Sequence, residues 1–358
     1  MSSAFDPSPS LFSRLPFTAS VARALGRSLV RHLREGRPHA EWPLAYDLMM
    51  SVLRQAAQDH PELSKALARA SSAPLPLSLR SKVQLTQAAL AGLPAELYTP
   101  TRSPWDRARR RREQGPGETT FLFLHGGGYV TCSPRTHRDI ISRICLELGG
   151  RCIAPDYRLA PVHPFPAALE DALACYRSLL EAGQDPGRLF VGGDSAGGGL
   201  SLALAVRLRE LRLPLPRALV LLSPWVDLSL DHHALAPYAD HDYLAVEATL
   251  TNAREYAGAS ALSHPLISPQ HADLRGLPPM LIQTGEWELL REQNLTFART
   301  ARRAGVTVEH SLYPGMLHAF TCFAGLTEQG ARAIAELGQF MRAQLASEEP
   351  EAPRAKAS

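Results

Sequence analysis

The chain has 358 residues, of which 45% are hydrophobic and 20% are charged, and its formal net charge is +3. This balance excludes an intrinsically disordered chain, which needs low hydrophobicity and high net charge. Its 25 Gly and 29 Pro follow no period, which excludes a collagen-like chain. No run reaches the roughly 18–20 apolar residues of a membrane-spanning helix, so stable membrane insertion is not expected.

The amino terminus and the cysteines indicate a reducing compartment. Residues 1–6 lack the basic stretch that precedes the apolar core of a secretory signal. The cysteines are odd in number and have no CxxC spacing, which argues against a disulfide framework and against a zinc site. They are Cys132, Cys145, Cys152, Cys175 and Cys322. We therefore expect a cytoplasmic protein with free thiols.

The amino-terminal part of the chain differs from the rest. Residues 1–80 are rich in Ala, Leu and Arg, have helical patterns and contain no convincing strand. Further on, residues 107–112 contain five arginines, which is compatible with nucleic-acid binding. Asp106, Glu113 and the low net charge favour a solvated loop instead, so no nucleic-acid partner is expected.

From about residue 116 onward, apolar and β-branched runs alternate with helical patterns. The predicted strands are Thr119–Leu124, Arg151–Ala154, Arg188–Val191, Ala218–Leu222, Pro279–Gln283 and Val306–Tyr313. Helices are predicted over Pro166–Glu181 and Ala196–Leu211. This alternation predicts an α/β fold, with a mostly parallel sheet covered by helices on both faces. The carboxyl ends of the strands then meet along one rim, where the sites of such folds lie.

One stretch interrupts the alternation. Residues 231–276 are too long for an ordinary connection between two strands and contain a predicted helix over Val246–Tyr256. Together with residues 1–80, this segment is expected to form a cap over the rim of the sheet. Residues 347–358 are polar and contain Pro and Ala, and we expect a disordered tail there.

The strongest local motif is G-x-S-x-G, formed by Gly193, Ser195 and Gly197. It directly follows a predicted strand and directly precedes a predicted helix, which is the setting of a nucleophile elbow. The glycines allow close backbone approach, and the helix amino terminus offers N–H donors to an oxyanion. The alternative is a glycine-rich turn that holds an ordinary serine, but the strand–turn–helix context favours the nucleophile.

A second glycine-rich motif, Gly126-Gly127-Gly128, follows His125 at the end of another predicted strand. Exposed N–H groups of this loop, together with that of Ala196, would form an oxyanion hole beside Ser195. A phosphate-binding loop is the alternative interpretation. It is weak because neither G-x-G-x-x-G nor G-K-[ST] spacing is present.

Taken together, the motifs resemble the hormone-sensitive-lipase-like family of α/β-hydrolases, which includes many bacterial carboxylesterases. Four further segments in the family's order extend the resemblance over roughly residues 90–345: 156–166, 222–227, 276–279 and 315–320. Val162 departs from the glutamate usual at its position. The resemblance implies an α/β-hydrolase domain over residues 81–346, with residues 1–80 and 231–276 as helical cap segments.

The resemblance also implies a catalytic triad, in the chain order nucleophile, acid, histidine. His318 follows the last predicted strand within Gly-Met-Leu-His-Ala-Phe and would be the general base for Ser195. The family's usual aspartate is absent after the preceding strand. Alignment of the following residues puts Glu288 at the acid position, 30 residues before His318, and Glu286 is the alternative. A carboxylate there would fix the imidazole tautomer.

Three other polar residues are expected to support this site. Asp194 and Asp227 match family positions and should brace the elbow and the neighbouring loops through hydrogen bonds. His125 should orient the glycine-rich loop and not act as a second base. No His, Asp and Glu spacing indicates a metal site, and no cofactor is implied.

The leading interpretation is a serine carboxylesterase that hydrolyses short- to medium-chain esters of small molecules through an acyl-enzyme. Hydrolysis of another acyl bond, such as a lactone, an amide or an acetylated small molecule, is an alternative. A non-catalytic small-molecule binder on the same fold is a third reading, although such receptors typically lack a triad member. The natural substrate, its stereochemistry and the oligomeric state, including a homodimer, stay open.

Overall fold

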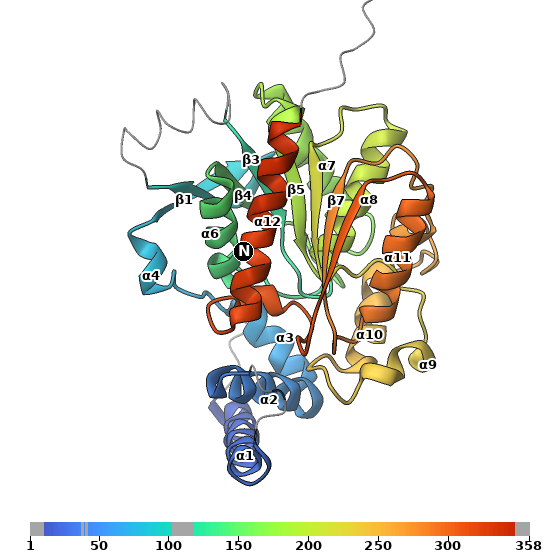
Figure 1. Ribbon diagram of the computed structural model, residues 1–358. Helices are drawn as coiled ribbons and strands as arrows, with labels where there is room; N and C mark the ends of the chain where they lie inside the picture. Colours follow the sequence, from blue (N-terminus) through green and yellow to red (C-terminus); the bar gives the residue numbers. More distant parts are fainter. Residues whose placement is uncertain (1–10, 37–38, 40–41, 102–117, 348–358) are drawn as a thin grey trace, which may run out of the picture.

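In the computed structural model, residues 11–36, 39, 42–101 and 118–347 are described (Figure 1). They build a central twisted sheet, helices on both of its faces, and a group of helices beyond one end. The arginine-rich stretch 107–112 and the tail from residue 348 lie outside the described residues, so the expectations for them stay predictions.

The sheet has eight strands, and six of them run parallel. Its first two strands form an antiparallel hairpin, and the second of these pairs antiparallel with the parallel part. In spatial order the strands are β1 (Val83–Leu90), β2 (Leu93–Pro100), β4 (Arg151–Pro155), β3 (Thr120–Leu124), β5 (Leu189–Asp194), β6 (Ala218–Leu222), β7 (Met280–Gly285) and β8 (Val308–Tyr313). The α/β fold with a mostly parallel sheet is therefore confirmed.

All six predicted strands are present as β3 to β8, with ends that differ by three residues or fewer. The hairpin of β1 and β2 lies outside the predicted set. Its first strand is exposed at four of its eight positions and buried only at its two ends, so no apolar run marks it. The turn at Ala91 and Gly92 has positive φ at both residues, 53° and 81°, as a tight two-residue hairpin turn requires.

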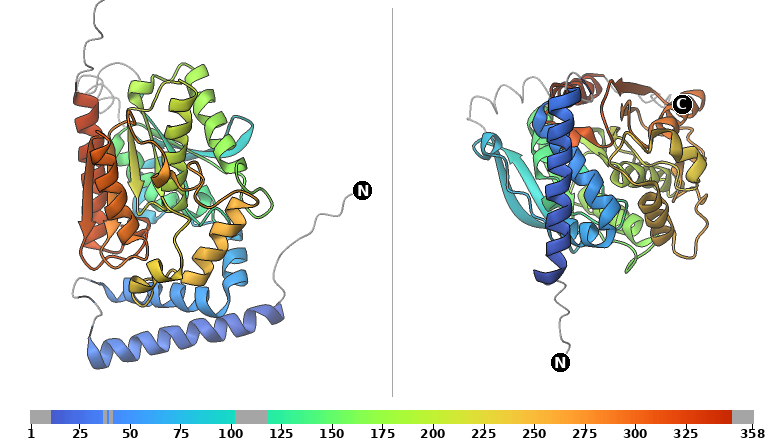
Figure 2. Two further views of the ribbon diagram at one scale, coloured as in Figure 1. Left: turned by 90° about the vertical axis from the view of Figure 1, so that its right-hand side faces the viewer. Right: turned by 90° about the horizontal axis from the view of Figure 1, so that it is seen from below.

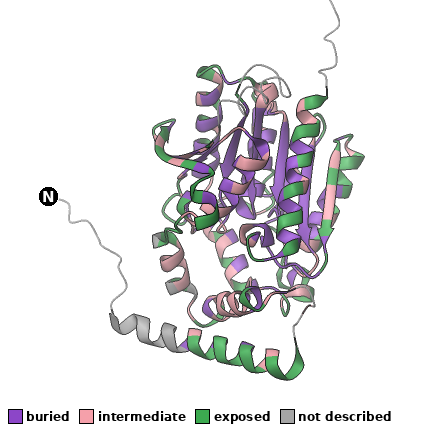
Figure 3. Cartoon of the chain, turned by 60° about the vertical axis from the view of Figure 1, so that its left-hand side comes forward, coloured by how far each residue is buried: buried purple, intermediate pink, exposed green. Residues whose placement is uncertain are grey.

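Helices cover the two faces of the sheet (Figure 1). One face packs against α6 (Arg138–Leu148) and α12 (Glu328–Ala346), whose apolar side chains share a core with β3 and β6. The other face packs against α7 (Ala167–Glu181), α8 (Ala196–Glu210) and α11 (Arg291–Arg303). The predicted helices at α7 and α8 are confirmed within one residue. Figure 3 shows the central strands as the most deeply buried part of the chain.

The remaining helices gather beyond the carboxyl ends of the parallel strands (Figure 2). They come from the two segments that are predicted to form the cap. Residues 1–80 contribute α1 (Leu11–Glu35), α2 (Leu44–Asp59) and α3 (Pro61–Ala70), and residues 231–276 contribute α9 (His232–Leu235) and α10 (Val246–Ala257). A short α4 (Leu77–Arg80) leads into β1. All regular secondary structure among the described residues of 1–80 is helical. Within the described residues, no helix is long and apolar enough to cross a membrane.

Candidate active site

Ser195 lies at a sharp turn between β5 and α8. Its φ of +52° is unusual for a residue with a side chain and represents local backbone strain. A Cβ atom at Gly193 or at Gly197 would collide with the carbonyl oxygen of Leu124. The glycines of the motif are therefore required by the close approach of β3, and the turn has the geometry expected of a nucleophile elbow.

The structure brings His318 to Ser195 from the loop that follows β8. The Nε2 atom of His318 lies 2.8 Å from the Oγ atom of Ser195, within hydrogen-bond distance. Both residues are buried, with exposed fractions of 2% and 9%. Burial lowers the pKa of His318 to about 4, because the charged imidazolium would lose its hydration. At neutral pH the ring is therefore an uncharged proton acceptor.

The glycine-rich loop lies beside this pair. The N–H group of Gly126 donates to Asp194 Oδ1 at 3.0 Å, so it is already bonded and does not face the pocket as an oxyanion donor. The predicted oxyanion hole therefore loses one of its four donors. The N–H groups of Gly127, Gly128 and Ala196 donate to no residue that the structure describes, and both glycines line the same pocket as Ser195.

Glu288 is completely buried at the end of the loop that follows β7. Its Oε2 atom accepts hydrogen bonds from Ser223 Oγ at 2.6 Å and from Gly285 N at 2.8 Å. Its Oε1 atom accepts from Asn294 Nδ2 at 2.9 Å. Burial raises the pKa of Glu288 to about 8, and these three donors oppose the rise because they stabilise the ionised form.

The predicted hydrogen bond between Glu288 and His318 is not present. The Nδ1 atom of His318 is buried without a hydrogen-bond partner among the described residues. Glu288 reaches the histidine loop indirectly, because Ser223 Oγ also accepts from the N–H group of Ala319 at 3.1 Å. The alternative acid, Glu286, is partly exposed and accepts from Gly315 N at 2.8 Å.

Asp242 is a buried carboxylate that the sequence did not single out. It comes from residues 231–276, yet its oxygens accept from Leu289 N at 2.7 Å and from His318 N at 3.3 Å. A third bond, from Tyr243 N, is local at 2.7 Å. Burial raises the pKa of Asp242 to about 6. This side chain thus ties the insertion to the backbone of both loops that carry Glu288 and His318. No motif surrounds it, so no signal in one sequence marks it.

We expect Asp242→Ala to lower the free energy of unfolding by about 3 kcal/mol or more, because each buried donor left without an acceptor costs about 1–3 kcal/mol. Asp240→Ala is the matched control, since that side chain is fully exposed two residues away. It should change the free energy by no more than about 0.5 kcal/mol. Urea unfolding followed by circular dichroism measures both, and equal values would show that the Asp242 contacts contribute nothing to stability.

The three residues expected to support the site all have hydrogen-bond partners in nearby loops. The Nδ1 atom of His125 lies 2.7 Å from Gly126 O, and this completely buried histidine is not among the residues that line the cavity above Ser195. Asp194 bonds Gly126 N and lies 3.3 Å from His137 Nε2. Asp227 accepts from Ser229 Oγ in its own loop at 2.6 Å and from Gln270 Nε2 at 3.1 Å.

One group of potential metal ligands occurs among the described residues. The side chains of His137, Asp194 and Cys322 place their ligand atoms within 4.8 Å of one another. Asp194 already bonds the histidine and the Gly126 N–H group, so these contacts are accounted for as support for the glycine-rich loop.

A cavity of about 450 Å³ lies above Ser195 and His318. Its apolar walls come from three parts of the chain: Met49 and Leu53 of α2, Leu244 near α10, and Trp225, Leu290 and Phe323 of the main domain. Such a cavity suits a small, largely apolar ligand whose reacting group points at the serine.

Comparison with known proteins identifies relatives along most of the chain. The model of a family described as having the alpha/beta hydrolase fold matches residues 121–322. An acetyl-hydrolase from Streptomyces hygroscopicus is 39% identical over 250 residues, which cover 70% of this chain and 83% of that protein. An esterase from Acinetobacter venetianus is 32% identical over 69% of this chain and 82% of its own length.

Solved structures of hormone-sensitive-lipase-type enzymes also match this chain. An esterase from the bacterial hormone-sensitive lipase family superposes with a TM-score of 0.69 at 34% identity, covering 91% of this chain and 98% of that one. A hormone-sensitive lipase from a metagenome library superposes with a TM-score of 0.73 at 34% identity, over 83% of this chain and 97% of the other. The first of these similarities therefore extends well beyond residues 121–322.

Proposed function

Since this chain belongs to the hormone-sensitive-lipase-like α/β-hydrolases and is a carboxylic ester hydrolase, we propose that Ser195, His318 and Glu288 cleave small-molecule esters of short to medium chain length. The observation that carries the proposal is the 2.8 Å separation of Ser195 Oγ and His318 Nε2 at the base of the apolar cavity. Nucleophile and base are within proton-transfer distance before a substrate binds.

In the proposed reaction, Ser195 Oγ attacks the ester carbonyl carbon while His318 Nε2 takes the hydroxyl proton. The tetrahedral oxyanion accepts hydrogen bonds from the free N–H groups of Gly127, Gly128 and Ala196. Collapse of this intermediate breaks the ester C–O bond, and His318 returns the proton to the departing alcohol. Water then attacks the acyl-enzyme by the same steps and releases the acid and the free serine.

Glu288 is proposed as the acid of the triad. Support comes from its complete burial and from its link to the His318 loop through Ser223. Imidazolium formed on His318 during the reaction adds a nearby positive charge, which favours the ionised carboxylate and opposes the effect of burial on its pKa. Glu286 is partly exposed and its hydrogen bond goes to the Gly315 backbone, so it is the weaker candidate.

The pH dependence follows from the buried base. His318 must be neutral to accept the serine proton, and burial places its pKa near 4. Protonation of His318 therefore removes activity only as the pH falls towards that value, so kcat/KM for p-nitrophenyl butyrate should show no inflection from this histidine between about pH 7 and about pH 5. Glu288, whose pKa burial raises to about 8, is the other group whose ionisation the profile reports. A pH–rate profile in constant ionic strength checks this. An inflection near the ordinary histidine pKa, about 6.5, would contradict it.

The cavity size predicts the acyl preference. A mainly apolar cavity of about 450 Å³ accommodates a limited ligand surface, so turnover should be highest for acyl chains of roughly four to eight carbons. A panel of p-nitrophenyl esters from acetate to palmitate measures kcat/KM directly. Acetate belongs in the panel because one relative is an acetyl-hydrolase. Faster hydrolysis of palmitate than of butyrate would contradict the prediction.

We also propose that residues 1–80 and 231–276 act as a cap that sets this preference, because Met49, Leu53 and Leu244 line the cavity. Leu53→Trp should shorten the pocket and lower kcat/KM for octanoate relative to acetate by at least about tenfold. Leu53→Ala is the matched opposite change and should shift the ratio towards longer chains. An unchanged ratio in both variants would mean that α2 does not limit the acyl chain.

A further inference from the structure

The outermost helix, α1, presents two different faces. One face docks on α2 through buried Ala24 and Ser28, through the ion pair of Arg31 with buried Asp47, and through a 2.5 Å hydrogen bond from Ser20 to Asp59. The opposite face is turned away from the rest of the molecule, as Figures 2 and 3 show.

The outward face is apolar. Leu25, Leu29 and Leu33 recur at every fourth position, and Val30 adjoins them; we call these four residues the α1 stripe. Their exposed fractions are 39%, 44%, 77% and 48% in that order. Of the ten large apolar side chains exposed in the described part of the chain, these four lie within nine residues. A surface patch of this kind marks an interaction site.

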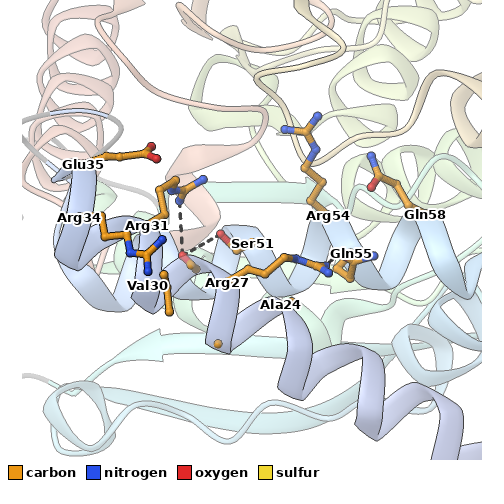
Figure 4. Close-up of a pocket in the computed structure, with 12 residues that line it drawn as sticks. Ala24, Arg27, Val30, Arg31, Arg34, Glu35, Ser51, Arg54, Gln55 and Gln58 are labelled. Carbon is orange, nitrogen blue, oxygen red and sulfur yellow. Dashed lines mark hydrogen bonds between the residues drawn. The ribbon is translucent and has the colours of Figure 1, made fainter.

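An arginine edge borders the stripe. At 3.6 residues per turn, Arg23, Arg27 and Arg34 project within roughly 40° of one another beside Val30. None of the three forms an ion pair with a carboxylate of the described residues. Below this edge, a groove of about 750 Å³ runs between α1 and α2 (Figure 4). Arg31 and Arg54 also line the groove, each paired with a carboxylate, Asp47 and Asp240, and Glu35 is the one carboxylate of the lining among the described residues.

We propose that α1 is a peripheral binding surface for anionic phospholipid bilayers. The α1 stripe would enter the boundary between headgroups and acyl chains, as the apolar face of an interfacial helix does. The arginine edge and the groove would bind lipid phosphates, which the planar guanidinium group can contact through two parallel hydrogen bonds.

Charge complementarity favours lipid over a second copy of the chain. In an antiparallel pair of helices joined along the stripe, the arginine edge of one copy would face the arginine edge of the other. In a parallel pair it would face Val21, His32 and, at the carboxyl end of the helix, Glu35, which sets one carboxylate against three arginines. Like charges at such positions destabilise association, whereas phosphate headgroups neutralise the edge.

The position of α1 would bring membrane binding close to the active site, an inference that rests on the proposed function. The helices directly beneath α1 supply cavity residues, Met49 and Leu53 from α2 and Ala68 from α3. A bilayer bound at α1 would therefore hold the cap of the active site next to lipid-dissolved esters. Binding itself needs no catalysis and is tested separately.

The test is co-sedimentation of the full-length protein with vesicles of phosphatidylcholine alone, or of phosphatidylcholine with phosphatidylglycerol. We expect binding to the anionic vesicles that weakens with added salt, because salt screens the arginines. Arg23→Gln, Arg27→Gln and Arg34→Gln combined should weaken it by about 100-fold. Leu29→Glu with Leu33→Glu should weaken it by at least about tenfold.

Matched variants control for charge and for surface apolarity. Arg177→Gln, Arg299→Gln and Arg303→Gln remove the same charge from exposed sites on α7 and α11, and Leu77→Glu alters an exposed leucine of α4. These should bind like the unaltered protein, and all variants should hydrolyse soluble p-nitrophenyl butyrate at unchanged rates. Equal binding to both vesicle types, no binding, or a dimer in light scattering that the Leu29 and Leu33 changes dissociate would overturn the proposal.

Discussion

Ser195→Ala is expected to lower kcat for p-nitrophenyl butyrate by about a million-fold, the effect typical of losing the nucleophile of a triad. The hydroxyl is the group that His318 Nε2 faces at 2.8 Å, and no other hydroxyl is bonded to that atom among the described residues. Without it, the free N–H groups of the glycine-rich loop can still polarise a carbonyl, but no acyl-enzyme forms.

The variant should fold normally. Alanine adopts the strained turn conformation as readily as serine does, and the backbone hydrogen bond from residue 195 to Leu222 O at 2.8 Å is retained. Thermal unfolding should therefore agree with that of the unaltered chain, and Ser178→Ala on α7 serves as a control for a serine remote from the site. Substantial turnover by a correctly folded Ser195→Ala protein would exclude Ser195 as the nucleophile.

Glu288→Gln is expected to lower kcat by about a thousand-fold or more, since amide replacement of a triad acid removes the charge that stabilises imidazolium. Glu286→Gln should change kcat by less than about tenfold, because that carboxylate is partly exposed and bonds the Gly315 backbone. The two glutamates differ by two positions in the chain, so the pair is a matched comparison.

A loss of kcat in Glu288→Gln must be distinguished from a loss of folding stability. Glutamine at position 288 disturbs the donors Ser223, Gly285 and Asn294, so the fold of the variant is checked by circular dichroism. Glu288→Asp keeps the charge and should recover part of kcat, which a merely structural role does not predict. If Glu286→Gln proves the more damaging change, the acid is Glu286 and the assignment of Glu288 is wrong.

The sheet and the elbow could be predicted because their signals are local in the sequence. The parallel strands β3 to β7 are buried almost throughout and appear as largely apolar runs. The glycines of G-x-S-x-G are required by contacts with Leu124. Pairing of Ser195 with His318 could be expected from chain order, although 123 residues separate them.

Other features depend on tertiary contacts that leave no local pattern. The hydrogen bond from the Gly126 N–H group to Asp194 links the glycine-rich loop to the G-x-S-x-G motif, and neither motif alone indicates this contact. Asp242 acts across the boundary between the insertion and the catalytic loops, and its neighbours in sequence do not mark it. The leucines of α1 follow a helical period like those of any amphipathic helix, and only the fold determines that this face is left exposed.

The most direct test of the central claim is to trap the covalent intermediate on the serine. The protein is incubated with diethyl p-nitrophenyl phosphate, which phosphorylates an activated serine and releases p-nitrophenol, and the modified peptide is identified by mass spectrometry. We predict one equivalent of p-nitrophenol per active chain, complete loss of esterase activity and a single modified residue, Ser195. Inactivation with the label on another residue, or full activity after stoichiometric labelling, would contradict the account.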